Sequence, residues 1–325
     1  MSKLDEILSD KQIPKNIIKM IMNLDDNGKK ALDSYYDETS EFFQNAHPML
    51  LARRFLADPY KYSELYHYTE SKALEAIFSS KTFLIGSIMH MNDDKEMRHS
   101  FELCIELLKE MNATKAEIDE FKLQWIFTMI HFDAYIWSFT VNDSSMAMER
   151  YGNLNIEFNN QTLQEKLANR FTPLNFANGW MKEGEAFVFP LVVNYDRDYQ
   201  LNYLRPIIRV VLSCIQNMKI DSYDMRKIID ESLRSLYILS LCFKRPEIFE
   251  EREIRFVILR IIENGKTQED TIFNGKPMIK LPINENDISA IIINHDWDGK
   301  EEKIFDILHK SGFSNVEIRK TRLPY

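Results

Sequence analysis

Glycine is scarce in this sequence: only nine of its 325 residues are glycine. The patterns GxGxxG and GxxxxGK[ST], whose backbone cradles phosphate groups, are absent, and so are the HExxH and GxSxG patterns of metalloproteases and serine hydrolases. A nucleotide bound by this chain would therefore have to be held by side chains and strand edges rather than by a glycine-built loop.

Cysteine is also scarce, and its three copies are widely spaced. Cys104, Cys214 and Cys242 form no CxxC pair and no cluster with histidine at metal-ligand spacing. This pattern predicts reduced thiols in the core of a cytoplasmic protein, and it argues against a zinc site. No metal is expected.

Long apolar runs and long basic runs are missing too. No window approaches the ~18 uninterrupted apolar residues of a membrane helix, and the opening MSKLDEILSDKQ is too acidic for a secretory signal. The 41 lysines and arginines are outnumbered by 50 aspartates and glutamates, so the formal net charge is −9. We therefore expect no membrane association, and the charge pattern typical of a duplex-binding protein is missing.

The residues that are present predict a folded chain with two regions. Apolar residues recur at helical spacing over residues 1–60, with breaks at Pro14, Gly28 and Pro48, which predicts a small helical extension. Residues 61–325 mix strand and helix patterns without regular alternation, which favours an α+β fold with a mainly antiparallel sheet. Strands are predicted near 65–68, 82–85, 134–140, 153–158, 186–194, 253–262, 277–281, 288–294 and 315–319. Helices are predicted near 71–79, 94–111, 116–130, 163–168, 201–218, 225–243 and 303–309.

The first candidate segment is His67-Tyr68-Thr69, at the end of a predicted strand. A histidine inside an apolar and aromatic run is often a packed core residue, here followed by Thr69 or Ser71 as a helix cap. The functional interpretation has His67 donating a hydrogen bond to a ligand hydroxyl, with Thr69 as a second polar contact. Both interpretations stay open at this point.

The second candidate segment is the strand pattern at 136–140 with the residues up to Tyr151. Strand alternation places Trp137 and Phe139 on one face and Ser138 on the other. The plain interpretation is a buried strand followed by a one-turn helix. In the functional interpretation, Ser138 and Tyr151 line a cleft, where the ring of Tyr151 offers a flat surface to a heteroaromatic ligand.

The third candidate segment holds Glu251, Glu253 and Arg255, which alternation would place on one face of a strand. Acidic residues are unfavourable in strands, so two of them on one face call for an explanation. One explanation is a solvated edge strand whose acids pair with Arg255. The other is a carboxylate that stabilises positive charge and is oriented by the neighbouring guanidinium.

Together the three segments resemble a widespread prokaryotic family of domains of unknown function. Its members show Leu-Tyr-His-Tyr-Thr, then Met-Asn-Asp…Glu, then a Ser-Phe strand with a tyrosine soon after, and a late Glu-x-Glu-x-Arg. The matching positions here are residues 65–69, residues 91–93 with Glu96, residues 138–139 with Tyr151, and residues 251, 253 and 255. The resemblance covers about residues 63–260 and leaves residues 1–60 outside.

That family is similar to a remote branch of the ADP-ribosyltransferase superfamily with a His-Tyr-Glu triad. The resemblance implies a split, mainly antiparallel β core with a helical insertion near 198–243. It also implies that His67 bonds a ribose hydroxyl of NAD, that Thr69 holds the nicotinamide amide and that Tyr151 stacks on nicotinamide. Glu253, with Glu251 as the alternative, would bond the ribose beside the scissile bond. Further cofactor contacts are expected from Tyr68, Ser138, Arg255 and Asn92.

The function implied by the resemblance is cleavage of NAD, as a substrate, and transfer of ADP-ribose to a protein or nucleic acid. With water as acceptor, the same residues would hydrolyse NAD. Such proteins often act as toxins or antiphage effectors. Tyr68 stands where the triad branch has glycine, and Met148 where the domain family usually has tryptophan; both favour the alternative of a non-catalytic module that senses a nucleotide or binds a partner. Residues 1–60 are the expected contact for a second copy or an antitoxin partner.

Overall fold

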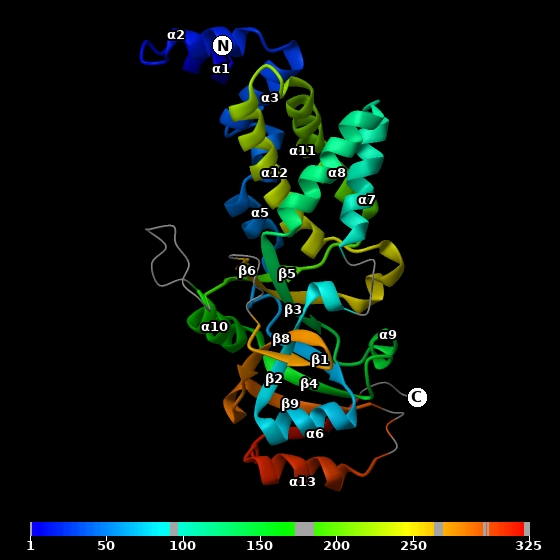
Figure 1. The fold of residues 1–325 in the computed structure, drawn as a ribbon. Helices are drawn as coiled ribbons and strands as arrows, with labels where there is room; N and C mark the ends of the chain where they lie inside the picture. The colour runs from blue at the N-terminus through cyan, green and yellow to red at the C-terminus, as the bar shows by residue number, and fades with distance from the viewer. Residues whose placement is uncertain are drawn as a thin grey trace. The chain divides into compact units, whose positions relative to one another are not determined.

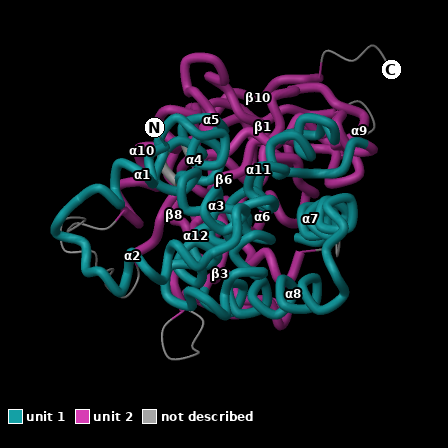
Figure 2. Tube along the Cα trace, turned by 90° about the horizontal axis from the view of Figure 1, so that it is seen from above, with its two compact units in different colours: residues 1–55, 93–131, 194–246 teal, residues 56–92, 132–193, 247–325 magenta. Residues whose placement is uncertain are grey.

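The computed structural model describes residues 2–91, 97–172, 185–262, 269–294, 297 and 299–321. The chain forms two compact units, coloured separately in Figure 2. Unit 1 comprises residues 1–55, 93–131 and 194–246, and unit 2 comprises residues 56–92, 132–193 and 247–325. The expected boundary at residue 60 thus becomes a discontinuous division, in which three separate stretches of chain build each unit.

Unit 1 is helical. Its helices are α1 (Lys3–Leu8), α2 (Lys15–Met22), α3 (Asp26–Tyr36), α4 (Glu41–Ala46), α5 (Pro48–Phe55), α7 (Arg98–Glu110), α8 (Lys115–Met129), α11 (Arg197–Asn217) and α12 (Ser222–Cys242). The early helices α3 and α4 pack against α11. Asn217 Nδ2 donates to Asp25 Oδ1 at 2.9 Å, and Asn45 Nδ2 donates to the carbonyl of Tyr203 at 3.0 Å. Residues 1–55 of the predicted extension and the predicted insertion at 198–243 therefore belong to one helical unit.

Unit 2 contains a mostly antiparallel sheet of ten strands (Figure 1). The strands are β1 (Glu64–Thr69), β2 (Thr82–Ser87), β3 (Phe132–Thr140), β4 (Leu154–Asn159), β5 (Phe187–Val192), β6 (Glu253–Ile261), β7 (Thr271–Phe273), β8 (Lys276–Pro282), β9 (Ile288–Ile293) and β10 (Glu317–Lys320). Their order is β10-β9-β4-β1-β3-β2-β8-β7, with β6 paired to both β3 and β5. Only the β9–β10 pair is parallel among the described strands. The α+β class predicted from the sequence is confirmed.

The helices of unit 2 are short. They are α6 (Ser71–Ser80), α9 (Met146–Glu149), α10 (Asn160–Phe171) and α13 (Glu301–Ser311), with 3-10 turns η1 (Ile88–His90) and η4 (Glu285–Asp287), and η3 (Pro246–Glu251) leading into β6. The expected cap of α6 was wrong. Its N-cap is Glu70, which makes no side-chain cap bond, and the hydroxyl of Ser71 instead accepts a hydrogen bond from Trp297 Nε1 at 2.8 Å.

The sheet forks at β3. One edge of β3 pairs with β6 along its whole length, from Phe132 to Thr140. The opposite edge pairs with β2 near its middle, where Gly86 lies opposite Ile136, and with β1 only at its last residue, where Tyr66 lies opposite Thr140. Since β1 and β2 use the same edge of one strand, β1 leaves β3 after a single residue pair.

One face of this sheet packs into the main core. Aromatic side chains of neighbouring strands meet there, and the rings of Phe83 and Trp137 lie 4.5 Å apart, those of Trp137 and Phe139 4.8 Å apart. These side chains and their aliphatic neighbours on β4, β6 and β9 form one buried cluster. The alternation expected for Trp137, Ser138 and Phe139 is therefore confirmed, since Ser138 alone of the three keeps partial exposure.

Among the described helices, none combines the length and the apolar composition that a membrane crossing requires.

Candidate functional site

Tyr151, Arg150 and Glu251 form a polar cluster at the end of α9. The Tyr151 hydroxyl donates to Glu251 Oε1 at 3.0 Å, and Arg150 pairs with the same carboxylate. The guanidinium of Arg150 also lies over the Tyr151 ring, with Cζ 4.8 Å from the ring centroid. Tyr151 is 46% exposed whereas Glu251 is only 3% exposed, so the phenol connects solvent to a buried carboxylate.

Gly152 sets the position of Tyr151. Its φ of +142° is a conformation that side chains rarely adopt, and a Cβ there would lie 2.1 Å from the carbonyl carbon of Thr69. Because only glycine allows this approach, the chain after Tyr151 passes directly against the end of β1. Thr69 itself is buried at that contact.

Tyr68 holds the loop that precedes α9. Its hydroxyl accepts a hydrogen bond from the Ser145 backbone N–H at 2.8 Å. Nearby, Asn155 Nδ2 donates to the carbonyl of Asp143 at 2.8 Å. Burial raises the pKa of Tyr68 to about 12, so the phenol stays neutral near pH 7. The bulky side chain of Tyr68 therefore has a structural task, which is to order the segment leading to Tyr151.

Glu253 and Arg255 form a buried ion pair on β6. Arg255 Nε and Nη2 donate to the two oxygens of Glu253 at 2.8 and 3.1 Å, and both side chains are less than 5% exposed. β6 lies between β3 and β5. The interpretation of this segment as a solvated edge strand was therefore wrong, because the acidic pattern lies on an interior strand and its charges are neutralised by pairing.

Glu251 does not share the strand face with Glu253. It ends η3, and β6 begins only at Glu253. Arg252 between them has φ +42°, a left-handed conformation that turns the chain. The expectation that Glu251, Glu253 and Arg255 alternate along one strand was therefore wrong for Glu251, and this turn is what brings its carboxylate to Tyr151.

His67 lies where β1 leaves β3. Its Nδ1 is 2.9 Å from the carbonyl oxygen of Ser138. A carbonyl can only accept, so Nδ1 carries the proton. Burial lowers the pKa of His67, which favours the neutral ring with an unprotonated Nε2. In this neutral tautomer Nε2 is an acceptor, so the expected donation to a ligand hydroxyl would require the protonated ring and stays a prediction.

The strand register separates His67 from Glu253. Tyr66, Thr140 and Glu253 are direct cross-strand partners, so their side chains share one face of the sheet. His67 follows Tyr66 and takes the other face, where its ring lies 5.8 Å from that of Phe139. We call the face with Glu253 the polar face and the face with His67 the core face.

The nine expected site residues are thus distributed unevenly. The polar face holds Tyr68, Ser138, Glu253 and Arg255, with Ser138 directly opposite Arg255 in the register. Tyr151 meets Glu251 just before the start of β6, and His67 and Thr69 belong to the core face. Asn92 lies outside the described residues. Arg150, which bonds to both Tyr151 and Glu251, was not predicted, and its only sequence signal is a basic residue beside the tyrosine.

No family model, curated protein or solved structure matches this chain. Among the described residues, no group of three or more histidines, cysteines, aspartates or glutamates is placed to hold a metal ion. The Tyr151 cluster offers a buried carboxylate beside a guanidinium and a partly exposed phenol, whereas the imidazole of His67 lies on the core face of the sheet.

Proposed function

We propose that unit 2 binds NAD, cleaves its nicotinamide–ribose bond and transfers ADP-ribose to a macromolecule. The observation that carries this proposal is the hydrogen bond between Tyr151 and Glu251, which joins a solvent-exposed ring to a buried carboxylate. The superfamily resemblance calls for these two chemical groups to act on one ligand. The fork between β1 and β3 supports the finer fold, a split ADP-ribosyltransferase-like sheet, because it separates the strands that carry the motif residues.

In this proposal Glu251 takes the charge-stabilising role. When the bond from ribose C1′ to nicotinamide breaks, the bonding electrons leave with nicotinamide and positive charge develops on the ribose. A carboxylate held beside that carbon lowers the barrier, and stacking on Tyr151 keeps the leaving group aligned. The nucleophile of the acceptor then bonds C1′ and loses its proton. Contacts favour Glu251 over Glu253, because Glu251 is the carboxylate that Tyr151 reaches.

Glu253, Arg255 and His67 act as positioning residues here. The Glu253–Arg255 pair stands at the start of β6, directly after the turn that presents Glu251. The bond from His67 to the Ser138 carbonyl ties β1 to β3 beyond their single residue pair. The ion pair supports β6 and the histidine bond supports the contact of β1 with β3. Neither role requires these side chains to touch the reacting atoms.

The decisive experiment follows nicotinamide release and label transfer from NAD. We expect wild-type protein to release nicotinamide, Glu251→Gln to lose at least 100-fold in rate, and Tyr151→Phe to weaken NAD binding less than Tyr151→Ala does. Glu253→Gln, combined with a check of its folding, separates the two carboxylates. Nicotinamide release without a labelled macromolecule would indicate hydrolysis, and no release by any form would contradict the proposal.

Arg150 offers a sharper probe of the same site. Its guanidinium lies over one face of the Tyr151 ring and pairs with Glu251, so it competes with a nicotinamide ring for both groups. We expect Arg150→Ala to bind NAD several-fold more tightly than wild type in calorimetry. Arg170→Ala is the matched control, because Arg170 also lies over a neighbouring ring and pairs with an acid elsewhere in unit 2.

A second candidate function is a non-catalytic nucleotide-sensing or protein-interaction module. Two observations favour it: both carboxylates are paired with arginine, and His67 lies on the core face. If this second function holds, calorimetry should detect NAD binding while no NAD is cleaved. Wild type and Glu251→Gln should then behave alike in the nicotinamide-release assay. Growth arrest on expression of wild type but not of Glu251→Gln would instead favour a toxin or antiphage effector.

A further inference from the structure

Residues of α3, α4 and α12 in unit 1 line a hollow of about 560 Å³, which we call the aromatic hollow. Its walls include the rings of Tyr35 and Tyr36 on α3, of Phe43 on α4 and of His47 just after α4. Tyr35 meets Tyr36 edge to face with ring centroids 5.0 Å apart, and Phe43 stacks on His47 at 4.7 Å. A hollow of this size with aromatic walls is typical of small-molecule sites, and aromatic walls favour a ligand that itself contains an aromatic ring.

The charged residues of the aromatic hollow fall into two groups. Glu231 and Lys227 are engaged by the wall, because the Tyr35 hydroxyl donates to Glu231 Oε2 at 2.6 Å and Lys227 Nζ lies 5.6 Å from the centroid of the same ring. Glu38 and Arg234 also line the hollow and are exposed. Neither of these two side chains makes an ion pair or a hydrogen bond to another described residue. The hollow therefore offers a ligand one carboxylate and one guanidinium.

His47 adds a polar atom that the described chain leaves unsatisfied. Its Nδ1 is buried and has no hydrogen-bond partner among the described residues. Buried polar atoms nearly always have a partner in folded proteins, and a ligand with a hydrogen-bonding group would supply one. The wall thus favours a ligand that is polar as well as aromatic.

We propose that the aromatic hollow binds a free aromatic amino acid. The ring of the ligand lies among Tyr35, Tyr36 and Phe43, its carboxylate accepts hydrogen bonds from Arg234, and its ammonium group pairs with Glu38. A guanidinium binds a carboxylate through two parallel hydrogen bonds. A zwitterion is selected because the two available charges of the site have opposite signs. The site belongs to unit 1, so this inference does not depend on NAD binding by unit 2.

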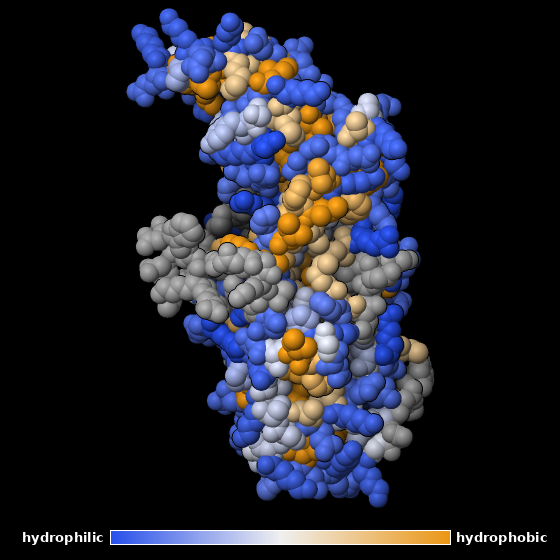
Figure 3. Space-filling model, in the orientation of Figure 1, coloured by the Kyte–Doolittle hydropathy of each residue, from blue (hydrophilic) through white to orange (hydrophobic). Residues whose placement is uncertain are grey.

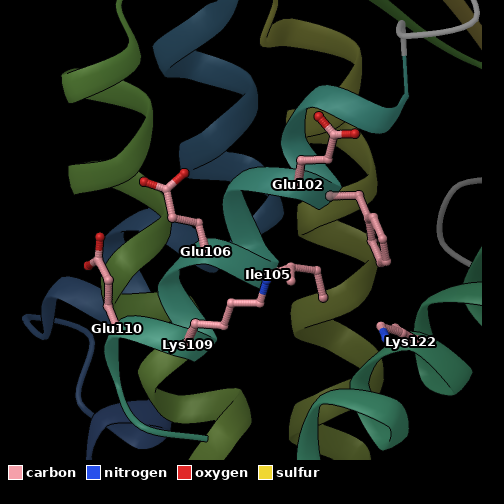
Figure 4. Close-up of a pocket in the computed structure, with 7 residues that line it drawn as sticks. Glu102, Ile105, Glu106, Lys109, Glu110 and Lys122 are labelled. Carbon is pink, nitrogen blue, oxygen red and sulfur yellow. The ribbon is translucent and has the colours of Figure 1, made fainter. Parts of the chain in front are cut away.

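Two other features of unit 1 fit such a ligand less well. Apolar residues lie exposed along α8 (Figure 3), but they carry no charge that could select the ends of a ligand. A second hollow, between α7 and α8, encloses about 720 Å³ and has Glu102, Glu106 and Glu110 among its walls (Figure 4). All three acids pair with arginines, with N–O distances of 4.0, 2.6 and 2.7 Å. Among the described residues that line this second hollow, Phe101 is the one aromatic.

The test is titration calorimetry of the full chain with L-tryptophan, L-tyrosine and L-phenylalanine. The amino acid that binds most tightly is then compared with its analogues that lack one charge. For L-tryptophan these are tryptamine, without the carboxylate, and indole-3-propionate, without the ammonium group. Wild type should bind the amino acid at least about tenfold more tightly than either analogue, because each analogue loses one charge-assisted hydrogen bond.

Two variants assign the charges of the ligand to the two residues of the wall. Arg234→Gln should abolish the preference for the amino acid over the amine, and Glu38→Gln should abolish its preference over the acid. Arg226→Gln is the matched control, because Arg226 is exposed on the same helix and is not among the described walls of the aromatic hollow. It should bind like wild type, and circular dichroism checks that all three variants keep the fold.

Three results would each overturn the inference. The first is a wild type that binds none of the three amino acids. The second is an Arg234→Gln variant that keeps the full preference for the amino acid over the amine. The third is an Arg226→Gln variant that loses as much affinity as Arg234→Gln.

Discussion

The two units bury polar groups in different ways. In unit 1, two buried polar side chains serve the backbone: Asp221 accepts the N–H groups of Tyr223 and Asp224 at the start of α12, and Gln200 donates to two backbone carbonyls. In unit 2, buried charges meet one another, as Glu253 meets Arg255. Helix ends require backbone partners, whereas the Glu253–Arg255 pair joins two ionised side chains inside a sheet, so it is the better pointer to a function.

The largest effect should come from breaking the buried pair. Arg255→Met leaves the Glu253 carboxylate buried without its bidentate partner, which costs about 3–5 kcal/mol of unfolding free energy. Chemical denaturation measures this loss. The double variant Glu253→Gln with Arg255→Met should recover a large part of it, since no charge is then left unpaired. Equal stability of the single and double variants would contradict the pairing.

A smaller but still substantial loss is expected for Gly152→Ala. The positive φ alone costs about 1–3 kcal/mol, and the new Cβ would also overlap the backbone of Thr69. Gly275→Ala is the control, because Gly275 also has a positive φ (+76°) but its Cβ would meet nothing within 4 Å. A loss no greater at Gly152 than at Gly275 would mean that the approach to β1 is not tight.

A cap in unit 1 should matter less than the charge pair in unit 2. Asp221→Ala removes the acceptor for two N–H groups of α12 and should cost about 1 kcal/mol. Thermal or chemical unfolding of the Asp221→Ala and Arg255→Met variants gives both losses of stability for comparison. If Asp221→Ala cost more than Arg255→Met, the contrast between the two units would be reversed.

The smallest effect is a dependence on pH. Burial lowers the pKa of His67 below its ordinary value of about 6.5, so the unfolded chain binds this proton more readily than the folded chain. The neutral ring therefore contributes stability above about pH 6.5, which is lost as the pH falls toward the lower folded pKa. His67→Gln should flatten this part of the stability–pH curve. Unchanged slopes in wild type and variant would contradict the lowered pKa of His67.

Most elements could be predicted from the sequence because their periodicity is local. Strand β3 and helices α11 and α12 lie close to their predicted ranges. The strand missed was β7, whose hairpin with β8 turns at Asn274 and Gly275, both with positive φ. That Asn-Gly pair is a known hairpin signal, so β7 could have been found.

The site was less predictable because it depends on register and on one turn. Alternation along a strand indicates which residues share its faces, but the pairing of Tyr66 with Thr140 decides which face of β1 lies beside Glu253. The left-handed conformation of Arg252, which moves Glu251 to Tyr151, leaves no periodic signal. The partnership of Arg150 with Glu251 joins distant segments and could not be foreseen.

By itself the sequence determined the class of fold, the positions of most helices and strands, and the residue types available for chemistry, since these follow from local spacing and composition. Only the tertiary structure decided that the N-terminal helices belong with α11 and that Glu251 reaches Tyr151 while His67 faces the core. Those outcomes depend on contacts between distant segments, and the energies of such contacts exist only once the chain has folded.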